Sequence, residues 1–378
     1  MRIRDVACHV LEAPLARRFG WSLAETDRRT ALLVEVTAED GTAGWGESYG
    51  PAHANAAVVE RYYRPRLLGA DPLATELVWQ DLYALLRDHG RKGLAVQTLS
   101  GVDIALWDLK GKLLGQPVHR LMGGPLRERV RAYATGLYSR PEGDPAAYLA
   151  EEAAGYAAEG FPAVKLKVGY GVRHDVRNAR AVREAVGADV ALMVDANHAY
   201  DAASAVELGR RLADLDIGWF EEPVPPEDLA GYAEVRRGQP IPVAGGECEF
   251  TRFGFRELLL LRRCVDVAQP DTCAAGGLSE CKKIADMANA FGVRYVPHVW
   301  GTGVALAASL QLLAVLPHNP PCRFPLEPLL EFDRTEHPIR QAVLTAPIGH
   351  ERGWVAVPAG PGLGVEVDRA ALDRFRAA

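Results

Sequence analysis

Hydrophobic and polar positions change their spacing about a third of the way along the chain. Before residue 125, two segments alternate apolar and polar residues as antiparallel strands do, and three later segments repeat apolar residues with the helical period. The expected strands span residues 2–14 and 29–48, and the expected helices span 55–69, 72–88 and 95–115. Strands followed by helices indicate a separate α+β unit.

Beyond residue 130, short β-branched runs alternate with amphipathic helical segments. The runs span residues 130–136, 163–169, 191–197, 218–223, 241–247, 265–271, 293–300 and 322–327. This alternation is typical of βαβ units around a parallel sheet. Eight runs fit a closed barrel better than an open sheet. No GxGxxG motif opens a helix after a strand, so a dinucleotide-binding fold has little support.

The spacing therefore predicts the α/β fold class, with a TIM-type (β/α)7–8 barrel and an N-terminal α+β capping domain. We place the capping domain at residues 1–125, with loops that cover the active site, and the catalytic barrel at residues 126–345. Residues 346–378 are expected to return and pack on the capping domain.

Composition and charge narrow the class of protein. Of the 378 residues, 48% are hydrophobic and 24% are charged, which is ordinary for a globular protein. The net charge of -6, without a long basic run, gives no indication of nucleic-acid or membrane-surface binding. Six scattered cysteines, no signal peptide and no segment long enough to span a bilayer predict a cytoplasmic protein with reduced thiols.

Ionisable residues recur where seven of the eight runs end. They follow one another at intervals of about 24 to 29 residues, the length of one strand–helix unit in a barrel. They are Lys167, Asp195, Glu221, Glu247, Asp271, His298 and Glu327. A single carboxylate there is more often a helix cap or a solvated charge. A whole series in a barrel mouth is costly unless its members are paired or bind a metal.

Three of these carboxylates suggest a metal site. Asp195, Glu221 and Glu247 end three consecutive strands, and hard oxygen ligands at one height suit Mg²⁺. No cysteine or histidine accompanies them at ligand spacing, which disfavours zinc. Glu222 is expected to face the other way as a structural residue, and Glu249 is a weaker alternative ligand.

Two lysines interrupt an apolar strand in the segment "VKLKVG". Lys165 and Lys167 share a face by the period of two, and we expect each ammonium to lower the pKa of the other. A lysine with a lowered pKa can act as a general base. The alternative is that both lysines only neutralise the carboxylate series.

A carboxylate and a histidine end adjacent strands opposite the lysines. Asp271 beside His298 has the logic of an acid/base dyad, and the alternative is a core histidine with a satisfied hydrogen bond. Glu327 on the eighth run could donate a proton or a hydrogen bond to a substrate oxygen, although Glu331 lies nearby.

Taken together, the motifs resemble the enolase superfamily, mandelate racemase subgroup (mandelate racemase/muconate lactonizing enzyme-like). The resemblance covers nearly the whole chain through "VKLKVG", "MVDAN", "FEEP", "AGGE", "QPD", "PHVWGTG" and "FPLEPLLEFD". It implies Mg²⁺-dependent removal of the proton next to a substrate carboxylate, and a homo-oligomer. The implied metal ligands are Asp195, Glu221 and Glu247, and the implied catalytic residues are Lys165, Lys167, Asp271, His298 and Glu327.

Among branches of this family, the chain is most similar to the galactarolactone cycloisomerases. The shared-looking segments are "RAYATG", "GQPIPVAGGE", "PHVWGTGV" and "EPLLEFDRTEHP", while "CEFTRFG" after Glu247 departs from that branch and leaves the substrate open. The branch opens the lactone of a hexaric acid by β-elimination. Acid-sugar dehydratases are close behind. The alternatives are a racemase or epimerase of a 2-hydroxy acid and a non-catalytic metabolite-binding barrel.

In this family, loops of the capping domain set specificity. Segments 16–29 and 48–55 are the corresponding loops here, and arginines in them suit a second carboxylate or a polyhydroxylated chain. They offer Arg17, Arg18, Trp21, Tyr49 and His53. We expect the substrate to contact Asn197, Trp21, Arg18 and Tyr49.

Overall fold

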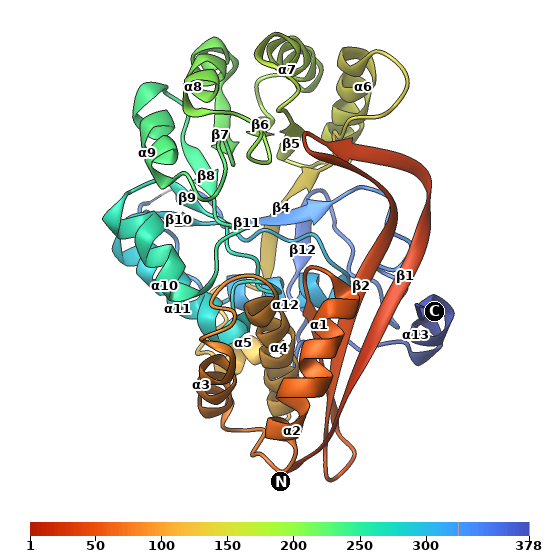
Figure 1. Ribbon diagram of the computed structural model, residues 1–378. Helices are drawn as coiled ribbons and strands as arrows, with labels where there is room; N and C mark the ends of the chain where they lie inside the picture. The colour runs from red at the N-terminus through yellow and green to blue at the C-terminus, as the bar shows by residue number, and fades with distance from the viewer. Residues whose placement is uncertain (324, 378) are drawn as a thin grey trace.

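A three-stranded antiparallel sheet begins the computed structural model, which describes residues 1–323 and 325–377. Its strands are β1 (Ile3–Trp21), β2 (Ala24–Ala38) and β3 (Ala43–Ser48). The β1–β2 hairpin is longer than β3 and extends beyond it along the side of the barrel, as far as β5 and α6 (Figure 1).

The hairpin corrects the expectation that residues 16–29 form a loop. The strands remain paired to their ends, with Trp21 opposite Ala24. The tip is held against the barrel because Gly20 and Ser139 exchange backbone hydrogen bonds of 3.0 Å in both directions. Exposed charges in this segment obscure the period of two, so the sequence alone suggests a loop.

Five helices and one π-helical turn complete the N-terminal part. They are α1 (Ala52–Val58), the π turn Val59–Tyr63, α2 (Arg64–Leu67), α3 (Thr75–Leu86), α4 (Leu94–Leu114) and α5 (Val118–Leu121). Helix α4 approaches β3 closely at glycines. A Cβ on Gly46 would lie 2.0 Å from the Gly101 carbonyl oxygen, so no larger residue fits there without moving the helix.

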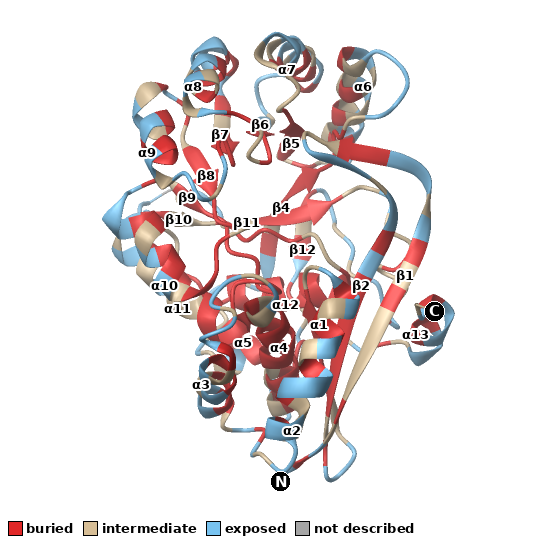
Figure 2. Cartoon of the chain, viewed as in Figure 1, coloured by how far each residue is buried: buried red, intermediate tan, exposed pale blue. Residues whose placement is uncertain are grey.

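The second part is a curled parallel sheet surrounded by helices (Figures 1 and 2). The sheet order is β10-β9-β8-β7-β6-β5-β4-β11, and a short strand, β12, pairs antiparallel with β4. The strands are β4 (Arg129–Thr135), β5 (Ala163–Lys167), β6 (Ala191–Asp195), β7 (Ile217–Glu221), β8 (Val243–Gly245), β9 (Val267–Ala268), β10 (Arg294–Tyr295), β11 (Leu329–Asp333) and β12 (Trp354–Ala356).

Strands β10 and β11 lie at the two ends of the sheet order, and the described residues form no backbone hydrogen bonds of a sheet between them. A side chain bridges this gap. The backbone N–H of Val299 donates a 2.9 Å hydrogen bond to Oε2 of Glu331. The expectation of a (β/α) barrel with a capping domain is therefore confirmed. The barrel is a curled sheet, and the buried carboxylate of Glu331 bridges the seam, which is the gap between its two edge strands.

Helices follow the strands, and several begin at a side chain that caps them. The helices are α6 (Pro145–Ala158), α7 (Val172–Val186), α8 (Ala202–Arg211), α9 (Leu229–Gly238), α10 (Thr251–Arg256), α11 (Gly277–Ala290), α12 (Gly303–Leu313) and α13 (Arg369–Phe375). A short 3₁₀ turn (Ala213–Leu215) follows α8, and a π turn (Glu257–Leu261) follows α10. Asp201 accepts from Ser204 N at 2.7 Å, and Asp228 accepts from Gly231 N at 2.8 Å. Each cap satisfies a backbone N–H that has no partner within the helix.

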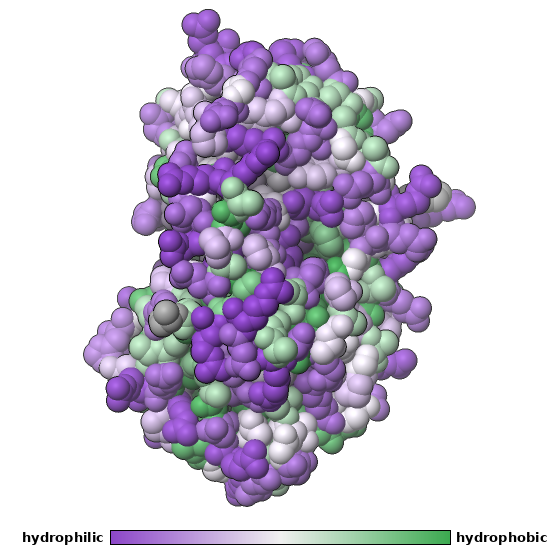
Figure 3. Space-filling view, turned by 90° about the vertical axis from the view of Figure 1, so that its right-hand side faces the viewer, coloured by the Kyte–Doolittle hydropathy of each residue, from purple (hydrophilic) through white to green (hydrophobic). Residues whose placement is uncertain are grey.

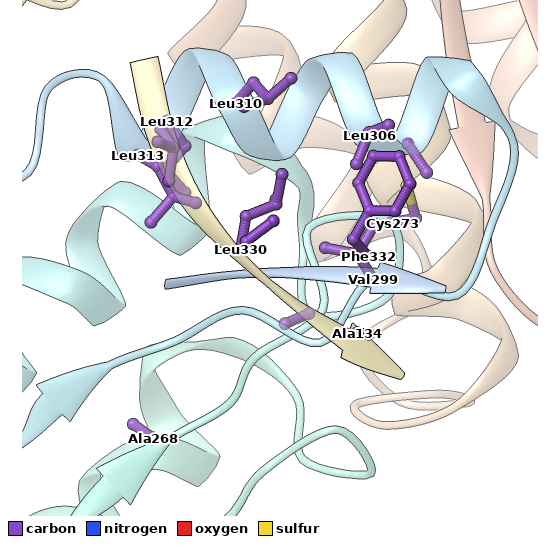
Figure 4. Packing of buried hydrophobic residues seen from close by; sticks show 14 of the residues in the cluster. Ala134, Ala268, Cys273, Val299, Leu306, Leu310, Leu312, Leu313, Leu330 and Phe332 are labelled. Atoms are coloured by element: carbon purple, nitrogen blue, oxygen red, sulfur yellow. The ribbon is translucent and has the colours of Figure 1, made fainter. Parts of the chain in front are cut away.

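Helix α12 is the most deeply buried of the barrel helices. Every residue of Gly303–Leu313 is buried, and Figure 4 shows Leu306 of this helix beside Phe332 of β11. Helix α12 is thus a core helix. Among the described residues, no helix is both long and apolar enough to cross a membrane.

The end of the chain lies against the first hairpin. The N–H of Ala377 donates to the Val10 carbonyl at 2.9 Å, and an ion pair joins Arg369 of α13 to Glu35 of β2. Figure 3 shows that the face on this side of the molecule is mainly hydrophilic, with hydrophobic residues in small separate groups. These contacts connect residues beyond 346 to the N-terminal sheet.

One buried carboxylate joins the two parts of the chain. Asp103 of α4 accepts hydrogen bonds from Ser279 N at 2.9 Å and Ser279 Oγ at 2.6 Å, in the first turn of α11. Asp103→Ala is expected to destabilise the protein by about 1–3 kcal/mol, because it leaves a buried helix N–H without a partner. Chemical denaturation measures this loss.

The exposed pair of Asp81 with Arg66, 3.1 Å apart, provides the control for that experiment. Asp81→Ala is expected to change the free energy of unfolding by less than about 1 kcal/mol, because exposed ion pairs contribute little. Equal losses in the two variants would contradict a special role for Asp103.

Candidate active site

Four charged side chains meet across three neighbouring strands. The strands pair in register, with Lys167 of β5 opposite Asp195 of β6, and Asp195 opposite Glu221 of β7. Lys165 precedes Lys167 by two residues and therefore points into the same barrel interior. All four side chains are almost completely buried, so their charges interact without screening by water.

Three carboxylates form what we call the acidic trio: Asp195, Glu221 and Glu247. One oxygen from each lies within 4.8 Å of the other two. Oε2 of Glu247 is buried without a hydrogen-bond partner among the described residues, which a cation would satisfy. The donor set is oxygen alone, so the residues present fit Mg²⁺. Glu249 is held elsewhere, because its Oε2 pairs with Lys92 at 2.6 Å.

Lys165 sits among three carboxylates. Its Nζ lies 2.6 Å from Glu221 Oε1, 2.8 Å from Glu331 Oε1 and 3.6 Å from Asp195 Oδ2. Glu331 also accepts a 2.6 Å hydrogen bond from Oγ1 of Thr135. These contacts fix the positions of both Lys165 and the carboxylate of Glu331 on β11.

The expectation that Glu327 ends the eighth strand is wrong. Glu327 precedes β11 and lines a cavity of about 340 Å³ together with Ala163 and Ala191, the first residues of β5 and β6. It therefore lies at the N-terminal end of the barrel, opposite the acidic trio. Glu331, four residues later, occupies the position expected for Glu327.

The two glutamates make a matched pair of substitutions. Glu331→Gln is expected to lower kcat by about 10–100-fold, because Lys165 loses a charged partner and the seam loses its acceptor. Glu327→Gln is expected to leave kcat within about twofold, since it lies far from the reacting groups. Steady-state kinetics on both variants measures the two effects. A larger loss of kcat in Glu327→Gln than in Glu331→Gln would contradict the assignment of Glu331 to the active site.

The expected lowering of the lysine pKa values is also wrong. Burial has the largest single effect on the pKa of Lys167 and lowers it, and Lys165 lowers it further as expected, but the surrounding negative groups, Asp195 first among them, together outweigh both and raise it. Burial likewise opposes a raised pKa at Lys165, where Glu221 and Glu331 dominate and the pKa lies well above its usual value. The nearest charges to each ammonium are carboxylates rather than the other lysine.

On the other side of the sheet, a histidine and an aspartate form the predicted contact. His298 Nδ1 lies 2.6 Å from Asp271 Oδ2, and the two residues form an isolated parallel bridge after β9 and β10. His298 Nε2 lies 3.7 Å from Oε2 of Glu247. Burial acts to lower the pKa of His298, but Glu247 and Asp271 raise it to about 10. The ring therefore reaches from its aspartate to the acidic trio.

The expected substrate-contact residues divide into two groups. Near the site, the ring of Tyr49 lies 5.6 Å from that of His298 edge-on, and the backbone N–H of Asn197 donates to Asp195 Oδ1 at 2.9 Å. The Asn197 side-chain oxygen is buried and without a partner among the described residues. Trp21 at the hairpin tip packs edge-on against Trp300, with ring centroids 6.0 Å apart.

The arginines and His53 lie farther out. Arg17 and Arg18 are exposed and line a cleft of about 1130 Å³ together with Tyr138. His53 is exposed on α1. Tyr138 also contacts Lys167, whose Nζ lies 5.0 Å from the centroid of its ring.

Several residues that support the site were missed in the sequence. Oε2 of Glu221 accepts from Gln269 Nε2 at 2.7 Å and from Trp219 Nε1 at 2.9 Å, which orients one member of the acidic trio. Gln269 precedes Asp271 by two residues, so strand alternation could have revealed it. Buried Arg29 lies over the Trp300 ring at 4.1 Å and is 3.3 Å from Asp333, and no sequence spacing connects these residues.

Comparison with protein families matches both parts of the chain. Residues 6–123 match the mandelate racemase / muconate lactonizing enzyme N-terminal domain, and residues 148–371 match the enolase C-terminal domain-like family. The chain belongs to the enolase superfamily. The resemblance inferred from the strand-end motifs is thereby confirmed.

Within this superfamily, the chain is similar to enzymes of known activity. It is 52% identical over 376 residues to D-galactarolactone cycloisomerase from Agrobacterium fabrum strain C58, covering 100% of this chain and 99% of the relative. It is 35% identical over 348 residues to arabinonate dehydratase from Saccharolobus solfataricus, covering 91% of this chain and 90% of the relative.

A solved structure supports the same placement. The crystal structure of 3,6-anhydro-D-galactonate cycloisomerase from Zobellia galactanivorans matches with a TM-score of 0.91 and 42% identity over 100% of both chains. Enolase-superfamily members use Mg²⁺, and a further solved relative is described with bound magnesium. This chain is an enolase-superfamily enzyme.

Proposed function

We propose that this enzyme removes the proton α to a carboxylate of a sugar-derived acid or its lactone and then eliminates a β-oxygen, with D-galactarolactone as the leading substrate. The observation that carries the proposal is the placement of two kinds of base on opposite sides of the acidic trio. Lys165 and Lys167 lie on β5, and the His298–Asp271 dyad lies at the ends of β9 and β10, four and five strands away in the sheet order.

The acidic trio is proposed to hold Mg²⁺ through Asp195, Glu221 and Glu247. When bound, Mg²⁺ supplies a Lewis acid that stabilises the negative charge developing on the substrate carboxylate. The positive charge of the cation would also lower the pKa of the neighbouring lysines. Gln269 and Trp219 hold Glu221 in the orientation that this binding needs.

Lys167 is the proposed base for the α-proton. Lys165 makes contacts within 4.0 Å with three carboxylates, whereas Lys167 makes such a contact with Asp195, which leaves the Lys167 ammonium less constrained. His298 is the proposed acid on the opposite face, where it would donate a proton to the departing β-oxygen. Asp271 fixes the orientation of the His298 ring. Lys167 and His298 are both buried, which keeps water away from the proton-transfer groups.

Identity to D-galactarolactone cycloisomerase over the whole chain favours a lactone substrate over an open-chain acid. An acid-sugar dehydratase is the second candidate, favoured by the likeness to arabinonate dehydratase. Both reactions use the same proton removal and differ in which β-oxygen leaves.

Turnover in D₂O distinguishes the candidates. The purified enzyme with Mg²⁺ is incubated with D-galactarolactone, 3,6-anhydro-D-galactonate, D-arabinonate and open-chain aldaric acids, and products are followed by ¹H NMR. Ring opening of D-galactarolactone to a keto-deoxy acid supports the leading assignment, and loss of water from an open-chain acid alone supports the second. Deuterium exchange with an unchanged carbon skeleton would instead indicate an epimerase. No turnover or exchange with any of them would contradict the proposal.

A further inference from the structure

Three side chains of different chemistry meet just beyond the acidic trio. His198, Glu222 and Cys248 follow the ends of β6, β7 and β8, and one potential ligand atom from each lies within 4.8 Å of the other two. We call these residues the outer trio. A full strand–helix unit separates each from the next in sequence, which is why short-range ligand spacing does not reveal them.

The imidazole and the carboxylate of the outer trio are hydrogen bonded to each other, at a separation slightly shorter than that of two ligands of one metal. His198 Nδ1 is 2.9 Å from Glu222 Oε2, and two ligands of a tetrahedral Zn²⁺ with bonds of about 2.0 Å are roughly 3.3 Å apart. The backbone fixes the same two residues, because His198 N donates to the Glu222 carbonyl at 2.7 Å. Cys248 is a free thiol of intermediate burial.

Glu222 provides a second, independent indication of a ligand. Glu222 is 0% exposed, and its Oε1 accepts no hydrogen bond from a nitrogen or oxygen within residues 1–323 and 325–377, while the Cys248 thiol lies close to its carboxylate. A buried carboxylate oxygen without a partner costs free energy unless a further donor or a cation satisfies it. Strand alternation, from which Glu222 is expected to face away, does not extend to this residue, because its φ of 42° breaks the strand geometry.

We propose that the outer trio is a second metal site, which takes a borderline transition-metal cation such as Zn²⁺ through one nitrogen, one oxygen and one sulfur. Imidazole and thiolate favour such cations over Mg²⁺, whereas the acidic trio offers oxygen alone. The metal bonds to the Cys248 thiolate, and the thiol proton passes to solvent. The His198 side chain is 25% exposed, which gives the cation a route in and leaves a fourth position to water.

Co²⁺ is the probe that reports on this site alone. Added to the enzyme in saturating Mg²⁺, Co²⁺ bound by a thiolate gives a charge-transfer absorption in the near ultraviolet, which an all-oxygen site does not give. We expect one equivalent of this band in the unmodified enzyme and none in Cys248→Ser. Cys322→Ser, which alters an exposed cysteine, is the matched control and is expected to keep the band.

A second variant protects the test against misfolding of Cys248→Ser. His198→Gln is expected to keep the band but to weaken Co²⁺ binding by at least about tenfold, since it removes one ligand. Absence of the band in the unmodified enzyme, its persistence in Cys248→Ser, or unchanged Co²⁺ affinity in folded His198→Gln would each overturn the proposal. The readout is spectroscopic, so its outcome does not depend on which sugar acid the enzyme turns over.

Discussion

Lys167→Met is expected to lower kcat by about 10²–10⁴-fold, the range that a general base typically contributes. Lys167 projects from the end of β5 with Asp195 as its partner, while Lys165 is held by Glu221 and Glu331 at 2.6 and 2.8 Å. Fixed contacts suit Lys165 to orienting carboxylates, and the freer Lys167 to moving a proton. Loss of α-deuterium incorporation in D₂O, measured beside kcat, locates the defect in proton removal.

The lysine variant needs a folding control and an outer-surface control. Asp195 keeps Lys165 at 3.6 Å after the substitution, so we expect Lys167→Met to fold and to retain a cooperative thermal transition. Lys282→Met, on the partly exposed face of α11 where Lys282 pairs with Asp286, is expected to retain kcat within about twofold. A Lys167→Met enzyme with a tenth or more of the original kcat would assign the base elsewhere.

Glu247→Gln is expected to separate metal affinity from stability. The amide removes one negative ligand, so Mg²⁺ affinity should fall by about 10–100-fold and turnover should fall with it. In the absence of Mg²⁺ the thermal midpoint should stay the same or rise, because the substitution relieves repulsion between Glu247 and its neighbours Glu222 and Asp195. Calorimetric titration with Mg²⁺ and melting in a chelator measure the two effects.

Glu249→Gln is the matched control for the metal experiment. Its carboxylate pairs with Lys92 at 2.6 Å and accepts from Phe250 N at 2.7 Å, so it stands apart from the acidic trio. Mg²⁺ affinity is expected to be unchanged in this variant. Weakened Mg²⁺ binding in Glu249→Gln, or unchanged binding in Glu247→Gln, would contradict the assignment of the acidic trio.

Much of the barrel follows from one regularity of the sequence. Parallel strands in register place their last residues at one height, so Lys167, Asp195 and Glu221 could be brought together from spacing alone. The contact of Asp271 with His298 follows for the same reason, since their strands are neighbours. The alternation of residues within each strand and the length of each strand–helix unit are enough to predict which strand-end residues meet.

Other features depend on distances that the sequence does not encode locally. Glu327 and Glu331 lie on either side of the start of β11, and only hydrogen bonding within the sheet marks where that strand begins. The direction of the lysine pKa shifts depends on which charge is nearest across strands, which spacing along one strand does not give. Asn197 and Glu222 leave their strands at positive φ, so period-two reasoning fails just beyond the strand ends.

The β1–β2 hairpin has a consequence for how enzymes of this design diversify. Its tip is joined to the barrel through main-chain atoms of Gly20, which exchange hydrogen bonds with Ser139 and accept one from Tyr170 Oη at 3.2 Å, and through Ser22 Oγ, which donates to the Ala196 carbonyl at 2.7 Å. The exposed side chain of Leu23 is therefore free to vary without loosening the arm. Mutations near the N-terminus can therefore change the surface of the hairpin tip, while the residues proposed to transfer protons, which are encoded far downstream, stay the same.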